Sequence, residues 1–475
     1  MQIDADVRRL TLSVLLAGFV GPQPPRWLLD ALDAGLGGVV LFGSNLGDGT
    51  AVDKLTAQLR AAAGRDVVVA LDEEGGDVTR LDTVRGSASP GAAALGYLDD
   101  PDVTEQAYAV IGERLASAGV TVNLAPVADV NVDPRNPVIG VRSFGSDPDV
   151  VARHVAAAVR GLQSVGVAAC VKHFPGHGAT TSDSHHEVAT LRRSRAELDA
   201  VELPPFRAAI AAGTRAVMTG HLIVPSLDAS DLATVSKPIT TGLLRDELGF
   251  AGTTVTDALE MRALAGTLGM KGGFVAALTA GADAIETGAQ NYPDFVARIG
   301  DVVQRALDDG QLERARLEEA SERTANLAKL SSRPHRIGWR GEDNLDWGGC
   351  IEVLGTLPHL ERPLVVECRP PAGIASGDLP WSLAEPLARR LPGTDHIGVQ
   401  DAGSAGKLAQ QAADRSVVLV VRDPVRHAWQ LDYLGLATVI VDVGWPVELP
   451  TGTPVVRTRG VAPGLLEATV AALTR

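Results

Sequence analysis

The sequence is poor in cysteine, and it lacks both a basic tract and a long apolar run. Its 475 residues include three cysteines, Cys170, Cys350 and Cys368, whose wide spacing indicates neither a disulfide framework nor a CxxC metal site. So few cysteines favour a reducing compartment, and we expect a cytoplasmic protein. Since the formal net charge is −15 and no basic stretch could follow a phosphate backbone, we expect no nucleic-acid partner. We also expect no membrane partner, because no run reaches the roughly 18 to 20 apolar residues that span a bilayer.

Short apolar runs, separated by amphipathic helical segments, make up the first two thirds of the chain. These runs consist almost entirely of apolar residues, which is typical of parallel strands buried on both faces. Eight such runs over roughly 290 residues predict an α/β fold with a (β/α)8 TIM-like barrel, and an open doubly wound sheet is the alternative. The predicted strands are 12–19, 37–42, 66–72, 120–127, 167–174, 216–222, 252–259 and 282–288.

The N-terminal segment needs a separate interpretation, because residues 8–25 imitate a signal peptide with two arginines, an apolar run and small residues. Asp4 and Asp6 make the preceding stretch nearly neutral, however, and the segment passes directly into a helix-then-strand pattern over 27–42. We therefore favour a first barrel strand over a cleaved signal sequence.

A second, smaller α/β domain follows the barrel. Residues 312–330 have a strongly helical composition, and periodicity is then lost over 331–349. We predict a barrel with its linking helix over 1–335, a linker over 336–349 and a C-terminal α/β sandwich domain over 350–475. The predicted strands of this domain are 363–368, 395–400, 416–423, 437–444 and 453–460.

Polar side chains stand where the predicted barrel strands end. In a barrel these positions meet at one rim, and charged groups there cost desolvation energy unless they are paired or belong to a site. We therefore expect a site for a polyhydroxyl or charged ligand. The residues are Asp72, Asp129, Lys172, His173, His221 and Asp257.

The segment 172–187, "KHFPGHGATTSDSHHE", concentrates four histidines in a stretch that proline and glycine prevent from being helical. Asp183 and His185 lie two residues apart, so the carboxylate could orient the imidazole and raise its basicity, giving an acid/base near neutral pH. Solvated loop histidines are the alternative. A metal site built on His173 and His177 is disfavoured because Pro175 and Gly176 break the helix that would align them. We expect no metal and no cofactor.

Asp257, in "TVTDALEM", stands near the end of the predicted strand 252–259 and has no basic neighbour in the sequence. This position suits a nucleophile toward an electrophilic carbon. A side chain that caps the next helix is the alternative.

Five long motifs together resemble glycoside hydrolase family 3, in its β-N-acetylglucosaminidase branch and its two-domain form. They run in order over most of the barrel, and the "KHFPGHG…DSH" segment is similar to the loop that supplies a histidine acid/base in that branch. The motifs are "LDEEGGDVTRL", "NLAPVADVNVDPRNPVIGVRSFGSDP", "CVKHFPGHGATTSDSHHEVATL", "AVMTGHLIVPSLD" and "TTVTDALEM".

The resemblance implies a role for each matched residue. Asp257 would be the nucleophile, His185 the proton donor and acceptor, and Asp183 its partner. Asp77 stands where an arginine or lysine is common, so we expect the neighbouring sugar subsite to differ, and His186 and Glu187 also depart from the usual pattern. The residues implied in binding the non-reducing sugar are Asp72, Arg80, Arg142, Lys172 and His173.

The implied activity is that of a retaining exo-β-N-acetylglucosaminidase on cell-wall saccharides, with a small carbohydrate as partner and a monomer as the working expectation. Phosphorolysis and a catalytically idle sugar-binding protein are the alternatives. We also expect the loop 175–187 to be loosely held and to close over bound sugar, because its glycine, serine and threonine residues offer little apolar surface to bury.

Overall fold

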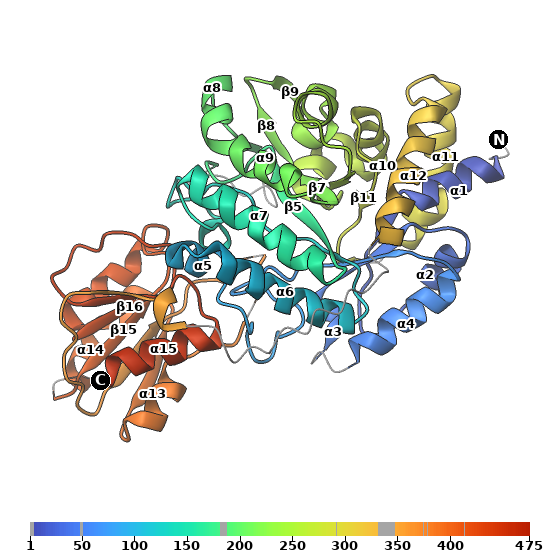
Figure 1. The fold of residues 1–475 in the computed structure, drawn as a ribbon. Coiled ribbons are helices and arrows are strands. Elements are labelled where there is room, and N and C mark those ends of the chain that lie inside the picture. The colour runs from blue at the N-terminus through green and yellow to red at the C-terminus, as the bar shows by residue number, and fades with distance from the viewer. Residues whose placement is uncertain are drawn as a thin grey trace.

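The structure is a computed structural model that describes residues 4–47, 51–180, 188–290, 292–330 and 347–475, apart from residues 374, 378 and 413. Figure 1 shows the two domains, with the barrel formed by the N-terminal part of the chain and the second domain by the C-terminal part.

Eight parallel strands form the barrel, in the order β10-β7-β5-β4-β3-β2-β1-β11. A further parallel bridge between Val255 and Ala284 joins β10 to β11 and brings the two ends of the sheet together. Each strand lies within one of the eight predicted runs, so the barrel is confirmed and the open sheet was the wrong alternative. The strands are β1 (Leu15–Ala17), β2 (Gly38–Leu41), β3 (Val68–Leu71), β4 (Val122–Asn123), β5 (Ala168–Phe174), β7 (Ala216–Thr219), β10 (Thr253–Thr256) and β11 (Ile285–Glu286).

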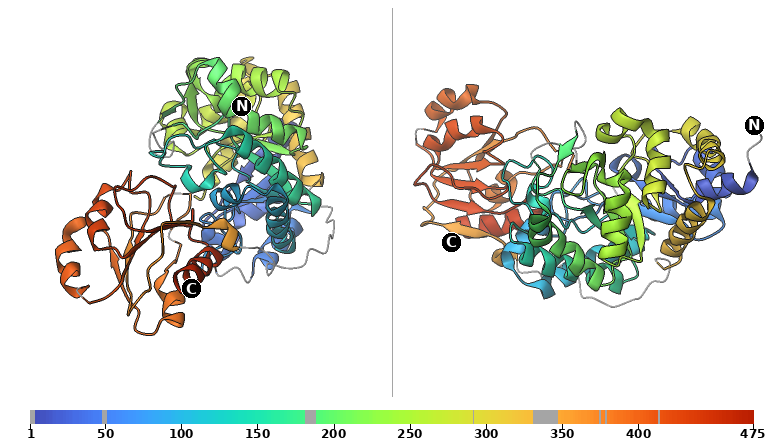
Figure 2. Two further views of the ribbon diagram at one scale, coloured as in Figure 1. Left: turned by 60° about the vertical axis from the view of Figure 1, so that its left-hand side comes forward. Right: turned by 90° about the horizontal axis from the view of Figure 1, so that it is seen from above.

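Helices surround the sheet, as the two views of Figure 2 show, and bury their apolar faces against it. A small sheet of β6 (Ala189–Thr190), β8 (Leu222–Val224) and β9 (Asp228–Leu232) is formed by the segments that follow the barrel strands β5 and β7. The α-helices are α1 (Ala5–Ser13), α2 (Arg26–Asp33), α3 (Gly43–Leu46), α4 (Val52–Ala63), α5 (Ala92–Leu98), α6 (Pro101–Ser117), α7 (Pro148–Ser164), α8 (Arg195–Glu197), α9 (Leu203–Ala211), α10 (Arg262–Ala280), α11 (Pro293–Asp308) and α12 (Arg314–Leu330). The segments η1 (Gly140–Arg142) and η3 (Ala233–Val235) are 3₁₀ helices, whereas η2 (Leu198–Glu202) and η4 (Pro238–Glu247) are π-helices.

The inside of the barrel is packed with small and branched side chains, so it is a core and not a channel. Leu16, Val40 and Met218 belong to this inner cluster. Leu327 and Ala328 of α12 belong to it as well, so the predicted linking helix covers part of the barrel interior.

The N-terminal prediction was partly wrong, because α1 occupies residues up to Ser13 and the first strand begins only at Leu15. Asp4 caps this helix by accepting a hydrogen bond from the Asp6 amide, and Val7 and Leu10 are buried. The apolar run at 12–19 therefore contains the end of a helix and a short strand.

Among the described residues, α10 is long and apolar enough to meet the criteria for a membrane-crossing helix. It is interrupted at Gly269, whose φ of 67° and ψ of 158° are not helical. Its Phe274 and Leu278 are buried in the core of the barrel domain.

The second domain has a six-stranded sheet in the order β12-β17-β16-β15-β13-β14. The five predicted strands are present and pair in parallel, whereas the antiparallel edge strand β12 was not predicted. The predicted linker lies largely outside the described residues, which resume at Trp347. The elements are η6 (Trp347–Cys350), β12 (Glu352–Leu354), β13 (Leu364–Cys368), α13 (Ala384–Arg390), β14 (Asp395–Val399), η7 (Ala402–Ser404), α14 (Ala405–Gln411), β15 (Val417–Val421), η8 (Ala428–Leu436), β16 (Val439–Asp442), β17 (Val455–Arg457) and α15 (Pro463–Leu473).

The two domains are joined by apolar and cation–π contacts around α5. Ala94 of α5 packs with Cys350, Ala462 and Leu465 of the second domain. The guanidinium of Arg459 lies over the ring of Tyr97, 3.7 Å from its centroid. This cation–π contact helps to hold the second domain against the barrel.

Candidate active site

A buried network of four charged side chains lies at the mouth of the barrel. Lys172 Nζ is 2.5 Å from Asp72 Oδ1 and 2.7 Å from Glu74 Oε1. Arg142, from η1, donates through Nε and Nη2 to the two carboxylate oxygens of Glu74 at 2.9 and 2.8 Å. The network thus joins the segments that follow β3 and β4 to the end of β5. It contains three of the predicted sugar-binding residues together with Glu74, which was not predicted.

The charges of this network stabilise one another. Burial by itself would raise the pKa of Glu74, but Arg142 and Lys172 outweigh it and hold that pKa below its ordinary value. Burial would likewise lower the pKa of Lys172, and Asp72 and Glu74 reverse the effect and raise it. Glu74 and Lys172 therefore stay charged at neutral pH, and they offer an acceptor and a donor to a polyhydroxyl ligand.

Asp129 organises the segment that leaves β5. Its Oδ2 lies 2.7 Å from His173 Nδ1, and its Oδ1 accepts the His177 backbone amide at 2.7 Å. Burial would raise the pKa of Asp129, but the two histidines hold it below its ordinary value. The predicted sugar-binding residue His173 is therefore held by a fully buried carboxylate. Asp129 was noted at the rim, but its bonds to this segment were not foreseen.

The beginning of the predicted loop is firmly held, which corrects the expectation that little fixes 175–187 to the barrel. His177 is buried, and its Nδ1 is 2.6 Å from Thr180 Oγ1. Gly178 approaches the backbone so closely that a Cβ there would lie 2.0 Å from Val130 O. Polar contacts and this close backbone approach hold residues 177–180, and Ala179 packs against the core. Residues 181–187, which include Asp183 and His185, lie outside the described residues.

Asp257 follows β10 at the same mouth. Its amide donates to Thr219 O at 3.2 Å, and its Oδ1 accepts the Ala258 amide at 2.8 Å. The helix-capping alternative was wrong, because α10 begins at Arg262 with Met261 at its N-cap. The nearby His221 lies within 3.0 Å of Ala258 O through Nε2 and within 2.8 Å of Thr234 Oγ1 through Nδ1, which holds the turn that carries Asp257.

Glu286, at the end of β11, is a second mouth carboxyl group that was not predicted. It is 4% exposed, and its pKa is raised well above the ordinary value by burial and by the charges of Asp72 and Asp257. These effects place Asp257 in the same electrostatic environment as the Lys172 network. In the sequence, Glu286 stands near the end of the eighth predicted strand, 282–288, which is the position that identified the other polar residues of the mouth.

The predicted sugar-binding residue Arg80 lies against the second domain. Its Nη2 donates to Ala375 O of the second domain at 2.8 Å, so the loop after β3 contacts both domains. Asp77, from the same loop, also faces the second domain: its Oδ2 is 2.6 Å from Arg422 Nη2 and its Oδ1 accepts the Val461 amide at 2.8 Å. The unusual acidic residue at 77 therefore contributes to the domain interface.

No group of three or more potential metal ligands occurs within the described ranges.

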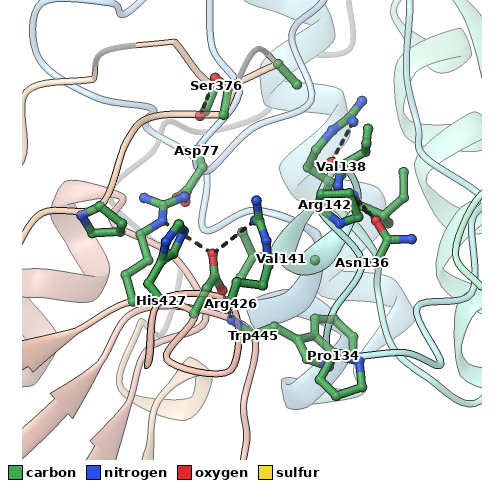
Figure 3. A pocket seen from close by; sticks show the side chains of 18 of the residues that line it. Asp77, Pro134, Asn136, Val138, Val141, Arg142, Ser376, Arg426, His427 and Trp445 are labelled. Carbon is green, nitrogen blue, oxygen red and sulfur yellow. Dashed lines mark hydrogen bonds and ion pairs between the residues drawn. The ribbon is translucent and has the colours of Figure 1, made fainter. Parts of the chain in front are cut away.

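A pocket of about 720 Å³, its open mouth included, lies between the domains. Figure 3 shows Arg142, Asn136 and Val138 on its barrel side, with Arg426 and His427 on the side of the second domain. Because Arg142 also binds Glu74, this pocket adjoins the charged network at the barrel mouth.

Comparisons with known proteins show which sequences and structures this chain is similar to. The sequence profile of the family described as "Glycosyl hydrolase family 3 N terminal domain" matches residues 28–327. A "Beta-hexosaminidase" from Xanthomonas oryzae pv. oryzae is 34% identical over 358 residues, which cover 73% of this chain and 98% of that protein. "Beta-hexosaminidase A" from Pseudoalteromonas piscicida is 33% identical over 326 residues, which cover 63% of this chain but only 53%, about half, of that protein.

Among solved structures, the chain is similar to a glycoside hydrolase family 3 beta-N-acetylglucosaminidase from Paenibacillus sp. str. FPU-7. The identity is 30% and the TM-score is 0.89, and the alignment covers 98% of this chain and 96% of that one. The likeness therefore extends over both domains.

Proposed function

Because the chain belongs to glycosyl hydrolase family 3 and is a glycoside hydrolase, we propose that it releases terminal N-acetyl-β-D-glucosamine from the non-reducing ends of saccharides. The names of the matched relatives support this sugar. We further propose that the saccharides come from cell-wall peptidoglycan, that the reaction takes place in the cytoplasm, and that it retains the anomeric configuration. The observation that carries the proposal is the buried network of Lys172, Asp72, Glu74 and Arg142 in the electrostatic environment of Asp257.

The network is suited to hold the terminal sugar. Lys172 can donate to hydroxyl oxygens, while Asp72 can accept hydroxyl hydrogens. Because these groups already neutralise one another, they need little rearrangement when a ligand replaces water, and bound sugar is oriented by fixed partners. His173, held by Asp129, is proposed to line the same subsite.

In the proposed reaction, a carboxylate oxygen of Asp257 attacks the anomeric carbon as the bond to the leaving oxygen breaks. His185 gives its proton to that oxygen, and the sugar becomes covalently attached to Asp257. His185 then accepts a proton from water, whose oxygen attacks the anomeric carbon and releases the sugar and the Asp257 carboxylate. Asp183 orients the imidazole. The roles of His185 and Asp183 rest on the sequence alone, since both lie outside the described residues.

A histidine acid/base suits a mouth that already holds several acidic groups. A carboxylic acid becomes an anion when it gives up its proton, whereas an imidazolium becomes neutral. A neutral base therefore adds no negative charge beside Asp257, Asp72 and Glu74, and it does not repel an anionic leaving group.

The proposal is tested at Asp257. Asp257→Asn should lower kcat on an aryl N-acetyl-β-glucosaminide by roughly 10³-fold or more, because the amide is nearly isosteric but a poor nucleophile. N-acetylglucosamine binding, measured by calorimetry, should persist. The exposed Asp246 of η4 provides the matched control, and Asp246→Asn should behave as the wild type.

A slow, 5-fluorinated N-acetyl-β-glucosaminide should label Asp257 of the wild type covalently, as read by peptide mass spectrometry. Label on another carboxylate would contradict the nucleophile assignment. Failure of the wild type to turn over any β-N-acetylglucosaminide would contradict the proposed activity.

A further inference from the structure

Glu286 and Asp257 face the barrel axis from neighbouring strands. Successive side chains of a strand point to opposite faces, so a residue two positions after a member of the inner apolar cluster also faces inward. Val255 and Ala284 belong to that cluster, and a parallel bridge joins them. Asp257 follows Val255 by two positions, and Glu286 follows Ala284 by two. The two carboxyl groups therefore converge at the mouth end of the barrel interior.

Backbone hydrogen bonds hold the two residues side by side. The Glu286 amide donates to Thr256 Oγ1 at 3.0 Å, and the Glu286 carbonyl accepts the Leu259 amide at 3.0 Å. These bonds lie on either side of Asp257 in the sequence, so the main chain at Asp257 is fixed against that at Glu286. The thiol of Cys170, in the inner cluster, interacts electrostatically with both carboxyl groups, which supports their convergence.

The surroundings of Glu286 are rich in acceptors. Within the part of the chain that the structure describes, Glu286 Oε2 is buried and has no hydrogen-bond partner. Lys172 Nζ is already shared between Asp72 and Glu74. The groups that interact electrostatically with Glu286 are the carboxyl groups of Asp72, Asp257 and Glu260, the ammonium group of Lys172 and the thiol of Cys170.

Glu74, at the same mouth, shows what a buried carboxylate needs in order to stay ionised. It accepts hydrogen bonds from Arg142 through both oxygens and pairs with Lys172. Glu286 lacks such donors, and burial together with Asp72 and Asp257 raises its pKa well above the ordinary value. Buried polar groups are nearly always hydrogen bonded, and a carboxyl group among acceptors meets this need by carrying a proton and donating it.

We propose that Glu286 holds a proton during catalysis and donates it in a hydrogen bond to the Asp257 carboxylate, which makes Glu286 a positioning residue for the nucleophile. The inference deepens the proposed function and rests on it. The Ala258 amide holds Asp257 Oδ1 at 2.8 Å, and the bond from Glu286 fixes the carboxylate at a second point. The same donor stabilises this carboxylate when it leaves the anomeric carbon in the second step. Glu286 keeps its proton throughout, and no proton passes from it to the sugar.

Two substitutions at one position provide the test. A 5-fluorinated N-acetyl-β-glucosaminyl fluoride has a leaving group that needs little protonation, so its rate of labelling at Asp257 reports the nucleophile and not His185. Glu286→Gln keeps a donor but cannot ionise, whereas Glu286→Met can do neither. At pH 7, labelling should stay within about threefold of the wild-type rate in Glu286→Gln and fall about tenfold or more in Glu286→Met, as loss of a donor to a charged group predicts.

The pH profile of labelling separates this role from a purely structural one. In the wild type, labelling should slow at alkaline pH, where Glu286 loses its proton and its charge repels Asp257. Neither variant should show this alkaline decline. In Glu286→Met the acidic limb should move to higher pH, because loss of the donor raises the pKa of Asp257, whereas Glu286→Gln should keep the wild-type acidic limb.

Infrared spectroscopy provides a measurement that does not depend on turnover. At pH 7, the difference spectrum between the wild type and Glu286→Gln should contain the carbonyl band of a carboxylic acid, shifted in heavy water, and no carboxylate bands. Glu322→Gln is the matched control, since Glu322 is an exposed glutamate of α12. This variant should keep the labelling rate and both limbs of the wild-type profile.

Carboxylate bands in that difference spectrum, or an alkaline decline that persists unchanged in Glu286→Gln, would overturn the inference. A wild-type labelling rate and pH profile in Glu286→Met, even with a lower unfolding temperature, would also overturn it. The proposed function stands in each case if the wild type is labelled at Asp257. A wild type that turns over no β-N-acetylglucosaminide would overturn the proposed activity, and the role of Glu286 in it, whatever the infrared spectrum shows.

Discussion

Two carboxyl groups at the barrel mouth show that neighbours, and not burial alone, determine the charge of the site. Glu74 and Glu286 are both 4% exposed. Arg142 and Lys172 overcome the burial of Glu74 and lower its pKa, whereas burial together with Asp72 and Asp257 raises that of Glu286. The surroundings therefore favour the ionised form of Glu74 and the protonated form of Glu286. Counting acidic residues in the sequence does not reveal this difference.

His177 should make the fold sensitive to mild acid. Burial lowers its pKa from 6.5 to about 4. Between these values the unfolded chain binds a proton that the folded chain does not, so stability falls as pH drops from about 6.5 to about 4. Two and a half pKa units correspond to about 3 kcal/mol for a site that titrates alone. Asp129 titrates below this window, because its pKa is lowered from 3.8.

Urea unfolding at several pH values between 4.5 and 7.5 measures this dependence. His177→Asn should flatten the slope of unfolding free energy against pH, whereas His359→Asn, at an exposed position, should keep it. Equal slopes in all three proteins would show that His177 is not the group responsible.

His185 is expected to matter most for substrates whose leaving group needs a proton. General acid catalysis contributes about 10²–10⁴-fold, and a nitrophenyl group leaves largely unaided. His185→Ala should therefore lower kcat/KM much more for a disaccharide than for a nitrophenyl glycoside, and Asp183→Ala should show the same pattern more weakly. Comparable losses on both substrates would argue against an acid role.

At the scale of elements, the sequence was informative where one pattern dominated a whole segment. Buried parallel strands are apolar on both faces, so all eight barrel strands and five strands of the second domain could be predicted. The run at 12–19 combines the end of α1 with β1, and its composition does not reveal where helix gives way to strand. The edge strand β12 has half-exposed residues and so lacks the apolar signal.

The segment after β5 was misjudged for a different reason. Its glycines suggested a loose loop, yet Gly178 is required because the chain passes directly over Val130 O. Close packing of backbone on backbone leaves no trace in apolar content. In the same way, Asp77 suggested an altered sugar subsite, although its partners Arg422 and Val461 come from another domain.

Gly178→Ala should disturb both stability and catalysis through this close approach. The added methyl group must displace the backbone of Val130 or of the segment itself, and such overpacking typically costs about 1–3 kcal/mol. Because the segment leads toward His185, kcat on disaccharides should fall as well. Gly266→Ala, in α10, is the control, since its Cβ would meet Arg262 Cγ at an ordinary 3.8 Å. A Gly178→Ala variant with wild-type unfolding temperature and activity would contradict the packing argument.

At the scale of the whole molecule, the Asp77–Arg422 pair should couple the two domains. Asp77 is buried, and Arg422 has 20% of its side chain exposed. Asp77→Ala leaves a largely buried guanidinium and the Val461 amide without this partner, which is expected to cost about 3–5 kcal/mol of docking energy. Calorimetry should then show the second domain unfolding at a lower temperature, separated from the barrel.

A double-mutant cycle isolates the pair. Asp77→Ala with Arg422→Ala should be less destabilised than the sum of the single variants, because removing both partners leaves no unpaired charge. Strict additivity would mean that the ionic contact does not hold the domains together. Arg389→Ala, which breaks an exposed ion pair with Glu467 within the second domain, should leave the coupling between domains intact.

The contacts around α5 also set the order in which the pocket can be completed during synthesis. The barrel comes first along the chain, whereas the Val461 amide that binds Asp77 and the Ala462 and Leu465 side chains that pack on Ala94 come after every strand of both sheets. A nascent chain could thus form the barrel and most of the second sheet while the pocket between them was still open. Only translation through α15 lets the late segment lock the second domain against α5, so premature termination after β16 would leave the barrel mouth without its opposite wall.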